Sequence, residues 1–263
     1  MKSIGFVSLV GAGPGDPDLM TVKAVRRLQE ADLVLYDALA TPKMLELAPR
    51  AQRFFVGKRA RRKAVNQETI HQLMIRAARR GRRVVRLKAG DPFVLGRGGE
   101  EALALRAAGI PFEVVPGVTS ATAAPGLAGI PVTHRGLSSG FAVVSGHAEE
   151  AYGPMLEAIR PNSLTLIVLM GMATRAALAR FLIERGWRPA TPAAIVCAAS
   201  TPQMTTWTGR LDELMAGRLD EQARAWGDAP GTIAIGNVVS LSALIAERDE
   251  PTSTIAAVAV GRR

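Results

Sequence analysis

The sequence is poor in residues that act through sulfur or imidazole. It holds one cysteine, Cys197, and three histidines in 263 residues. A single cysteine excludes an intramolecular disulfide, and its position in the apolar run 193–199 predicts an inert thiol in a buried strand rather than a nucleophile. Because the histidines and the cysteine show no ligand spacing, we expect no metal site.

Long hydrophobic runs are also absent. The longest ones, such as residues 164–170, are far shorter than the roughly 20 residues that cross a bilayer. The start of the chain has no basic segment leading into an apolar stretch and a cleavage site. We therefore expect a cytoplasmic protein with no membrane partner. Hydrophobic residues make up 48% of the chain, enough for the core of one large or two small domains.

Acidic residues are scarce in one part of the chain. Residues 1–138 carry 22 Lys and Arg against 11 Asp and Glu, whereas residues 139–263 carry 11 against 12. Within residues 50–88 there are 14 basic residues and one acid, Glu68. Such a field favours a polyanionic partner, either nucleic acid or a small molecule with many carboxylates. For any single arginine, a solvated surface position is the simpler interpretation.

The first half repeats a strand–helix pattern. Short apolar runs predict strands at residues 4–10, 33–36, 54–56, 84–87 and 112–115. Predicted helices open at Thr21, Asn66 and about residue 100, and the last two end at Gly81 and Gly109. In the first helix Val22, Val25 and Leu28 share one face. The alternation predicts a mainly parallel sheet covered by helices.

The pattern changes from about residue 138. Apolar runs predict strands at residues 141–145, 164–170, 193–197, 205–208 and 232–235, and one helix at 173–185. Because short strands now outnumber helices, we expect a second α/β domain with a mixed sheet. The predicted division is residues 1–137 and 138–250, with a flexible tail over 251–263.

A glycine-rich loop, GAGPGDP at residues 11–17, follows the first predicted strand. A loop of this kind lets a nucleotide-like ligand approach bare backbone. The dinucleotide-binding fingerprint needs a third glycine where this chain has Asp16, so a Rossmann dinucleotide site is disfavoured. A ligand loop and a structural tight turn remain about equally supported.

A second loop, LKAGDPFVLGRGGEE at residues 87–101, also joins a predicted strand to a helix. It holds four glycines within residues 90–99, an entropic cost that a close approach to a ligand explains. Asp91 offers acceptors for ribose hydroxyls, and Arg97 has the fork geometry that grips carboxylates. Glu100, one helical turn from Arg97, is spaced to orient it, although an ordinary surface pair has the same spacing.

Together with further motifs, these loops resemble the uroporphyrinogen-III C-methyltransferases of the tetrapyrrole methylase family. The resemblance covers almost the whole chain, and GDPFVLGRGGEE is its most specific part. The matching motifs are VGAGPGDPDLMT (10–21), VLYDALA (34–40), VGKR (56–59), GDPFVLGRGGEE (90–101), VVPGVTSA (114–121), GIPVTHR (129–135), SGH (145–147), LMGM (169–172) and AASTPQ (198–203).

The resemblance implies a fold and an activity. The implied fold is the two-domain α/β tetrapyrrole methylase fold, usually a homodimer, with S-adenosyl-L-methionine (SAM) in the cleft between the domains. Enzymes of this group methylate C2 and C7 of uroporphyrinogen III. They form precorrin-2 through precorrin-1 and release S-adenosylhomocysteine. The product feeds sirohaem, cobalamin or haem d1 biosynthesis.

The resemblance also assigns roles to residues. The expected SAM site consists of Pro14, Ala89, Gly90, Asp91, Val94, Thr119, Ser120, Met170, Ala199, Gly231 and Thr232. Asp37 and Lys58 match a proton acceptor and donor, whereas Arg97, Glu100 and Arg135 match residues that hold the tetrapyrrole or assist proton removal. Ala89 stands where glycine is more usual and Ser120 where alanine is common. Both changes are small, so we expect SAM binding to survive them.

The implied chemistry suits the residues present. An electron-rich pyrrole ring attacks a sulfonium methyl without a nucleophilic side chain, and orientation alone can supply roughly 7–11 kcal/mol. Arginine keeps its proton, so we interpret Arg97 as a carboxylate clamp rather than a base. The basic stretch Arg59, Arg61, Arg62 and Lys63 is a candidate flap over a substrate with eight carboxylates.

Three alternatives stay open. An RNA methyltransferase of the same superfamily would suit the positive charge, but residues 50–88 hold only two aromatic residues, Phe54 and Phe55. Binders of single-stranded nucleic acid usually place stacking rings among their basic residues, so we expect no nucleic-acid partner. The other two alternatives are a methylase for another tetrapyrrole and a non-catalytic binder of SAM or tetrapyrrole.

Overall fold

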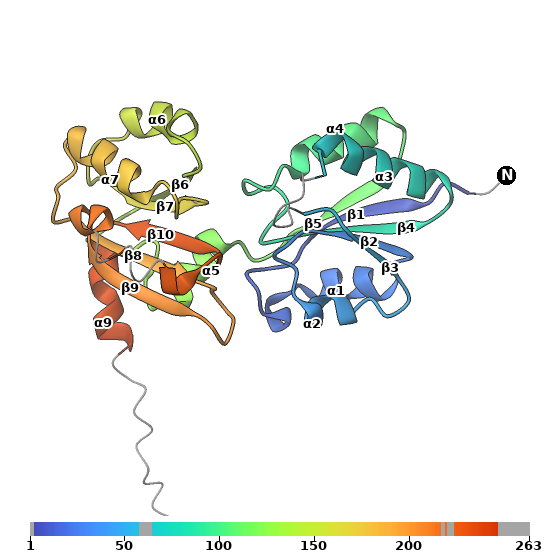
Figure 1. Cartoon of the computed structure of the whole chain (residues 1–263), viewed down its shortest axis with the longest axis horizontal. Helices are drawn as coiled ribbons and strands as arrows, with labels where there is room; N and C mark the ends of the chain where they lie inside the picture. The colour runs from blue at the N-terminus through green and yellow to red at the C-terminus, as the bar shows by residue number, and fades with distance from the viewer. Residues whose placement is uncertain (1–2, 58–64, 217–218, 220–223, 247–263) are drawn as a thin grey trace, which may run out of the picture.

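The computed structural model describes residues 3–57, 65–216, 219 and 224–246. These residues form two α/β units, each built on a five-stranded sheet (Figure 1). The candidate flap residues Arg59, Arg61, Arg62 and Lys63 and the predicted tail 251–263 lie outside the described residues.

The first sheet is entirely parallel and has the strand order β3-β2-β4-β1-β5. Its strands are β1 (Phe6–Gly11), β2 (Leu33–Tyr36), β3 (Gln52–Phe55), β4 (Arg83–Lys88) and β5 (Phe112–Val115). Because the strands are parallel, the loops that follow them all emerge at one edge of the sheet. That edge faces the second unit (Figure 1).

Helices cover both faces of the first sheet. The helices are α1 (Val22–Gln29), α2 (Pro42–Glu46), α3 (Gln67–Arg79) and α4 (Gly98–Ala107), with a short 3-10 turn at Pro17–Leu19. The α1 and α2 helices pack on one face and α3 and α4 on the other, with a separate apolar cluster under each pair. Thr21 and Asn66 cap α1 and α3 as predicted, each by accepting a backbone N–H bond.

The second sheet is mixed, with the order β6-β7-β10-β8-β9. Its strands are β6 (Phe141–Ser145), β7 (Thr165–Leu169), β8 (Pro192–Cys197), β9 (Thr205–Arg210) and β10 (Gly231–Ile235). The β6 and β7 strands are parallel, and the other pairs are antiparallel. The predicted combination of a parallel and a mixed sheet is therefore confirmed.

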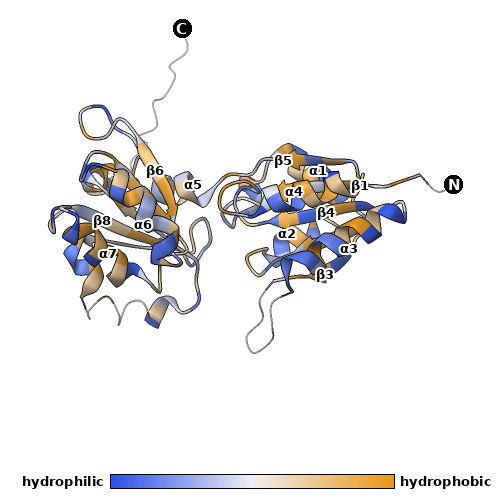
Figure 2. Cartoon of the chain, turned by 90° about the horizontal axis from the view of Figure 1, so that it is seen from above, coloured by the Kyte–Doolittle hydropathy of each residue, from blue (hydrophilic) through white to orange (hydrophobic). Residues whose placement is uncertain are grey.

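Helices α6 (Glu149–Ala158) and α7 (Arg175–Glu184) cover one face of the second sheet. Tyr152 and Trp187 are fully buried in the core beneath them. Short helical segments follow β9 and β10, at Asp212–Met215, Asn237–Ser240 and α9 (Leu241–Ala246). Strand β6 is largely hydrophobic, whereas β4 and helices such as α3 and α4 carry both hydrophobic and hydrophilic residues (Figure 2).

Helix α5 (Ser120–Leu127) follows β5 in the chain but packs against the second sheet, on β7, β8 and β10. Ala121 and Ile130 share an apolar cluster with Ile167 and Ala234. This packing favours a division near residues 117–119, which we propose, whereas the division at 137 and 138 stays a prediction. The sequence analysis did not predict α5 or α6. Each contains a proline, Pro125 or Pro154, and a glycine, Gly126 or Gly153.

Candidate functional site

A cleft of about 580 Å³ lies between the two units, at the loop edge of the first sheet. All eleven residues that the resemblance assigns to SAM line it. Pro14, Ala89, Gly90, Asp91 and Val94 come from loops after β1 and β4; Thr119 and Ser120 begin α5; Met170, Ala199, Gly231 and Thr232 come from the second unit. The structure thus brings together residues up to 218 positions apart.

Bare backbone forms the floor where three loops cross. Gly13 and Gly90 exchange backbone hydrogen bonds, with N···O distances of 2.8 and 3.2 Å. A Cβ atom on Gly117 would lie 2.2 Å from the carbonyl oxygen of Gly90 and 2.7 Å from Cα of Gly11. The glycines after β1 and β5 therefore allow loop-to-loop packing, and this packing fixes the position of Gly90 beside the cleft.

The backbone around the cleft is strained. Five non-glycine residues near the cleft have positive φ: Leu95 (53°), Arg97 (58°), Met170 (59°), Ala198 (49°) and Ser200 (62°). Such conformations are uncommon for residues with a Cβ and gather where function requires a particular backbone path. Ser200 Oγ also accepts a hydrogen bond from Asp16 N at 2.9 Å, which joins the loop after β1 to the second unit.

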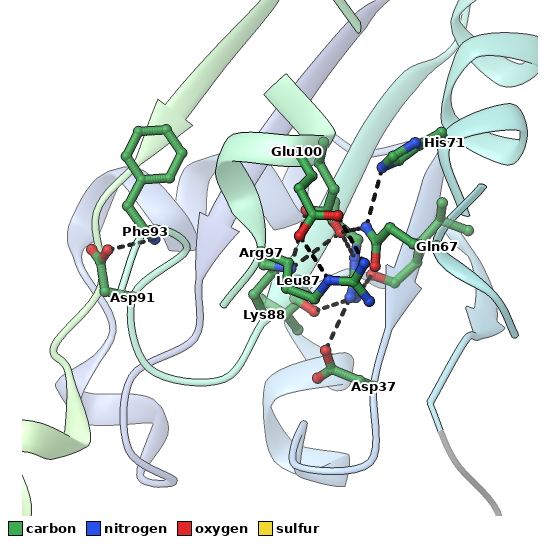
Figure 3. A network of polar contacts seen from close by, with 12 residues as sticks. Asp37, Gln67, His71, Leu87, Lys88, Asp91, Phe93, Arg97 and Glu100 are labelled. Atoms are coloured by element: carbon green, nitrogen blue, oxygen red, sulfur yellow. Dashed lines mark hydrogen bonds and ion pairs between the residues drawn. The ribbon is translucent and has the colours of Figure 1, made fainter. Parts of the chain in front are cut away.

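Asp91 supports the loop that it belongs to. Its Oδ1 accepts a hydrogen bond from Phe93 N at 2.8 Å (Figure 3), and its Oδ2 accepts one from Gly117 N at 3.0 Å. Both carboxylate oxygens are therefore engaged by backbone amides. The predicted contact of Asp91 with ribose hydroxyls stays a prediction, because it depends on the remaining lone pairs.

Arg97 and Glu100 form a bidentate pair at the cleft, with N···O distances of 2.9 and 2.7 Å (Figure 3). The hydrogen bond that Arg97 donates to Glu100 raises the pKa of Arg97 above its ordinary value. Arg97 is therefore a fixed cation and is unsuited to act as a base. Glu100 does not itself line the cleft.

The structure does not bring the predicted residue Arg135 to the cleft. Arg135 is exposed in the turn between Ile130 and β6 and does not line the cleft. Its predicted contact with the tetrapyrrole stays a prediction. Lys58, the predicted proton donor, lies outside the described residues.

A buried ionic network adjoins the cleft around Asp37 (Figure 3). Arg86 and Lys88, both 4% exposed, share the carboxylate of Glu101, which is 0% exposed. Arg86 also contacts Asp37, and Gln67 donates to Glu101 at 3.1 Å. Burial, followed by the charge of Arg86, lowers the pKa of Lys88.

The sequence analysis predicted Asp37 but missed the other members of this network. The available signal was the pair Arg86 and Lys88 among the buried residues that follow Arg83 in β4. Residues two positions apart in a strand point to the same face. A pair of cations on a face that should be buried requires anionic partners.

The histidines make local contacts. His147 Nδ1 lies 2.7 Å from Ser145 Oγ, and His71 Nε2 lies 3.3 Å from the side-chain nitrogen of Gln67. Within the part of the chain that the structure describes, no group of three or more His, Cys, Asp or Glu is placed to hold a metal ion. Nor is any described helix long and apolar enough to span a bilayer.

Comparison with known protein families identifies the class of protein to which this fold and this cleft belong. The family described as Tetrapyrrole (Corrin/Porphyrin) Methylases matches residues 7–215. The chain belongs to this family, as the resemblance implied.

Individual relatives show which members of the family the chain resembles. The chain is 42% identical over 240 residues to the uroporphyrinogen-III C-methyltransferase of Methanocaldococcus jannaschii, covering 90% of this chain and 98% of the relative. It is 45% identical over 243 residues to the siroheme synthase of Azotobacter vinelandii, covering 91% of this chain but 51% of the relative. The chain thus spans about half the length of the siroheme synthases that it matches.

Solved structures agree with the fold. The uroporphyrin-III C-methyl transferase of Thermus thermophilus, complexed with S-adenyl homocysteine, matches with a TM-score of 0.75 and 45% identity. The match covers 90% of this chain and all of the other. The predicted two-domain tetrapyrrole methylase fold is therefore confirmed.

Proposed function

We propose that this chain is a SAM-dependent C-methyltransferase that converts uroporphyrinogen III to precorrin-2 by methylation at C2 and then C7, or the reverse order. The observation that carries the proposal is the cleft between the units, which all eleven expected donor-site residues line. The names of the Methanocaldococcus and Thermus relatives support the substrate.

The cleft fits SAM and S-adenosylhomocysteine. Its volume lies within the roughly 300–1,000 Å³ of small-molecule sites. Bare backbone at Gly90 and Gly231 suits a flat base and ribose, and Val94 and Met170 offer apolar contact. When bound, SAM supplies an electrophilic methyl group on a sulfonium. The residues of this chain hold that group beside the macrocycle and exclude water from it.

The macrocycle side of the cleft requires cations and a base. Arg97 provides a bidentate cation for a carboxylate, oriented by Glu100. Arg135 and Lys58 are the further residues that we assign to carboxylate binding and proton donation. Asp37 lines the cleft and is our proton acceptor. The excess of positive charge in residues 1–138 steers a substrate with eight carboxylates toward the site.

Further parts of the proposal rest on the family. We assign the chain to the cytoplasm and to a homodimer, with no nucleic-acid or membrane partner. Its product would supply sirohaem, cobalamin or haem d1 biosynthesis, and the similarity to siroheme synthases favours sirohaem.

The direct test is incubation of the purified chain with SAM and uroporphyrinogen III, followed by mass spectrometry. We expect a product that has gained two methyl groups.

Arg97→Met should lower kcat/KM by roughly 30–150-fold, because it removes a charge-assisted bidentate contact of about 2–3 kcal/mol. Arg210→Met is the matched control, since Arg210 is an exposed arginine at the end of β9, away from the cleft, and pairs with Asp212. Its activity should equal that of the unaltered chain.

Other outcomes point to the alternatives. Turnover of SAM on other tetrapyrroles but not on uroporphyrinogen III would refute the substrate. Methylation of protein-free ribosomal RNA with a steep salt dependence would favour the RNA methyltransferase. Tight SAM binding without turnover on any tetrapyrrole would indicate a non-catalytic binder.

A further inference from the structure

The network beside Asp37 contains more charge than a stable core requires. Three of its members, Arg86, Lys88 and Glu101, are at most 4% exposed. Replacing buried ion pairs by packed apolar residues is often neutral or stabilising, so fold stability alone is a weak reason for such a cluster. Its position at the wall of the cleft suggests a role in the reaction.

We propose that Arg86, anchored by Glu101, is the positioning residue that fixes the carboxylate of Asp37 for proton removal. This inference rests on the proposed function. Arg86 Nη2 donates to Asp37 Oδ2 at 3.1 Å, while Arg86 Nε donates to Glu101 Oε1 at 3.0 Å. The guanidinium therefore spans two carboxylates, one at the cleft and one fully buried.

The other contacts of Arg86 hold it rigid. Its Nη1 donates to the carbonyl oxygen of Leu87 at 3.1 Å and lies 3.5 Å from that of Leu35. Glu101 is fixed in turn, because Lys88 Nζ lies 3.1 Å from both of its oxygens. A guanidinium with all three nitrogens engaged has no freedom to leave Asp37. Lysine has no planar fork and cannot make both contacts in this way.

The charges of the network are balanced. Arg86 and Lys88 are matched by Asp37 and Glu101 when both carboxylates are ionised. This part of the cleft therefore offers no surplus cation for a substrate carboxylate. What it offers is a carboxylate held at the cleft: Asp37 Oδ2 accepts from Arg86, while Asp37 Oδ1 is buried and has no hydrogen-bond partner among the described residues. The side chain of Asp37 lines the cleft and is 30% exposed, and the exposed part does not include Oδ1.

The proton step follows from this geometry. When the ring carbon gains the methyl group, the S–C bond breaks with its electron pair staying on sulfur, and the macrocycle becomes cationic. The cation becomes neutral by losing a proton, which the Asp37 carboxylate accepts and later passes to solvent. Arg86 keeps the carboxylate oriented before that transfer.

A double-mutant cycle tests whether Arg86 acts through Asp37. We expect Asp37→Asn to lower kcat by about 10²–10⁴-fold, the usual contribution of a general base. Arg86→Met should lower kcat by roughly 10–100-fold. The double variant should stay within about threefold of Asp37→Asn alone, because a lost base cannot be mispositioned. A purely structural role would lower kcat by the same factor in both backgrounds, and that result would overturn the inference.

Further measurements separate positioning from folding. The affinity for S-adenosylhomocysteine, measured by titration calorimetry, should change less than threefold in Arg86→Met. Added guanidinium should restore part of its activity, since Arg86 lines the cleft and its truncation leaves a space that opens there. If Arg86→Met does not fold, Arg86→Lys takes its place in the cycle. Arg106→Met is the matched control, an exposed arginine on α4 that contacts the ring of Phe112. It should retain full kcat.

The result is distinguishable from failure of the proposed function. If the unaltered chain methylates no tetrapyrrole, the proposed function is wrong and the cycle has no baseline. If the unaltered chain is active but the two substitutions multiply, or guanidinium restores nothing, the role of Arg86 is wrong while the proposed function stands.

Discussion

Gly117 occupies a position where two other backbones leave no room for a side chain. An added methyl group would lie 2.2 Å from the carbonyl oxygen of Gly90, inside any normal contact distance. We expect Gly117→Ala to destabilise the fold by about 1–3 kcal/mol, as overpacking does. It should also weaken S-adenosylhomocysteine binding, because relief of the clash displaces Gly90. Denaturant unfolding and titration calorimetry measure the two effects.

Gly99 is the matched control for this substitution. It lies in the first turn of α4, and a Cβ atom there would meet nothing within 4 Å. Alanine is the better helix former, so Gly99→Ala should be neutral or stabilising by up to about 1 kcal/mol. If both variants unfold alike, the crossing of the three loops does not limit the choice of residue.

Residues carried by sequence motifs could be predicted, whereas those defined by long-range partners could not. All eleven residues that the motifs assign to the SAM site line one cleft, and their contact with SAM stays a prediction. Cys197 is buried as expected, and burial raises the pKa of its thiol to about 11, which suits the inert role. Arg86 was missed because its partner Asp37 lies 49 residues away, and no local pattern records that contact.

At the scale of elements, Glu113 ties β5 to its neighbours. Its carboxylate accepts from Ser8 of β1 at 3.0 Å and pairs with Arg27 and with Lys23 of α1, the latter at 2.7 Å. Burial alone would raise the pKa of Glu113, but hydrogen bonds from Arg27, Lys23 and Ser8 lower it to about 2. The folded pKa lies below the ordinary value of 4.5, so ionised Glu113 stabilises the fold above about pH 4.5.

This contribution should disappear as the pH falls from 4.5 through 2. We expect Glu113→Gln to be less stable than the unaltered chain by about 1–3 kcal/mol at pH 7, with the difference shrinking toward pH 2. Urea unfolding at several pH values measures it. Glu157→Gln is the control, because its exposed pair with Arg185 should contribute less than about 1 kcal/mol. A constant difference between pH 7 and pH 2 would contradict the linkage.

Elements with a strong periodic or apolar signal were predicted within a few residues. Strands β1, β2 and β4 of the first sheet are buried along most of their length, and β1 and β4 run into glycine-rich loops, whereas the edge strand β3 is largely exposed. The pattern gave less information on which face a residue occupies. Val22 was expected to face the core with Leu28, yet it is 67% exposed, and Ala24 occupies the buried position instead. A small buried residue leaves a weak signal in a sequence pattern.

At the scale of the whole molecule, the cleft exists only because two separately packed cores meet. The apolar clusters under α3 and α4 and under α6 and α7 contain no common residue. The direct link described above, from Asp16 to Ser200, is one hydrogen bond between loops. A ligand that touches Ala89 and Gly90 on one side and Met170 and Thr232 on the other therefore has to stabilise both units at once.

Hydrogen exchange with bound S-adenosylhomocysteine tests this arrangement. At a ligand concentration 100 times Kd, binding to the folded state alone should add about 2.7 kcal/mol to the free energy of unfolding. Amides in the loop around Gly90 and at the start of α5 should exchange more slowly, and so should those around Met170 and Thr232. The amides of α6, which does not line the cleft, should be protected only through global unfolding. Because the donor is proposed to bridge both units, protection confined to one side would mean that it binds to a single unit, and the cleft would not be its site.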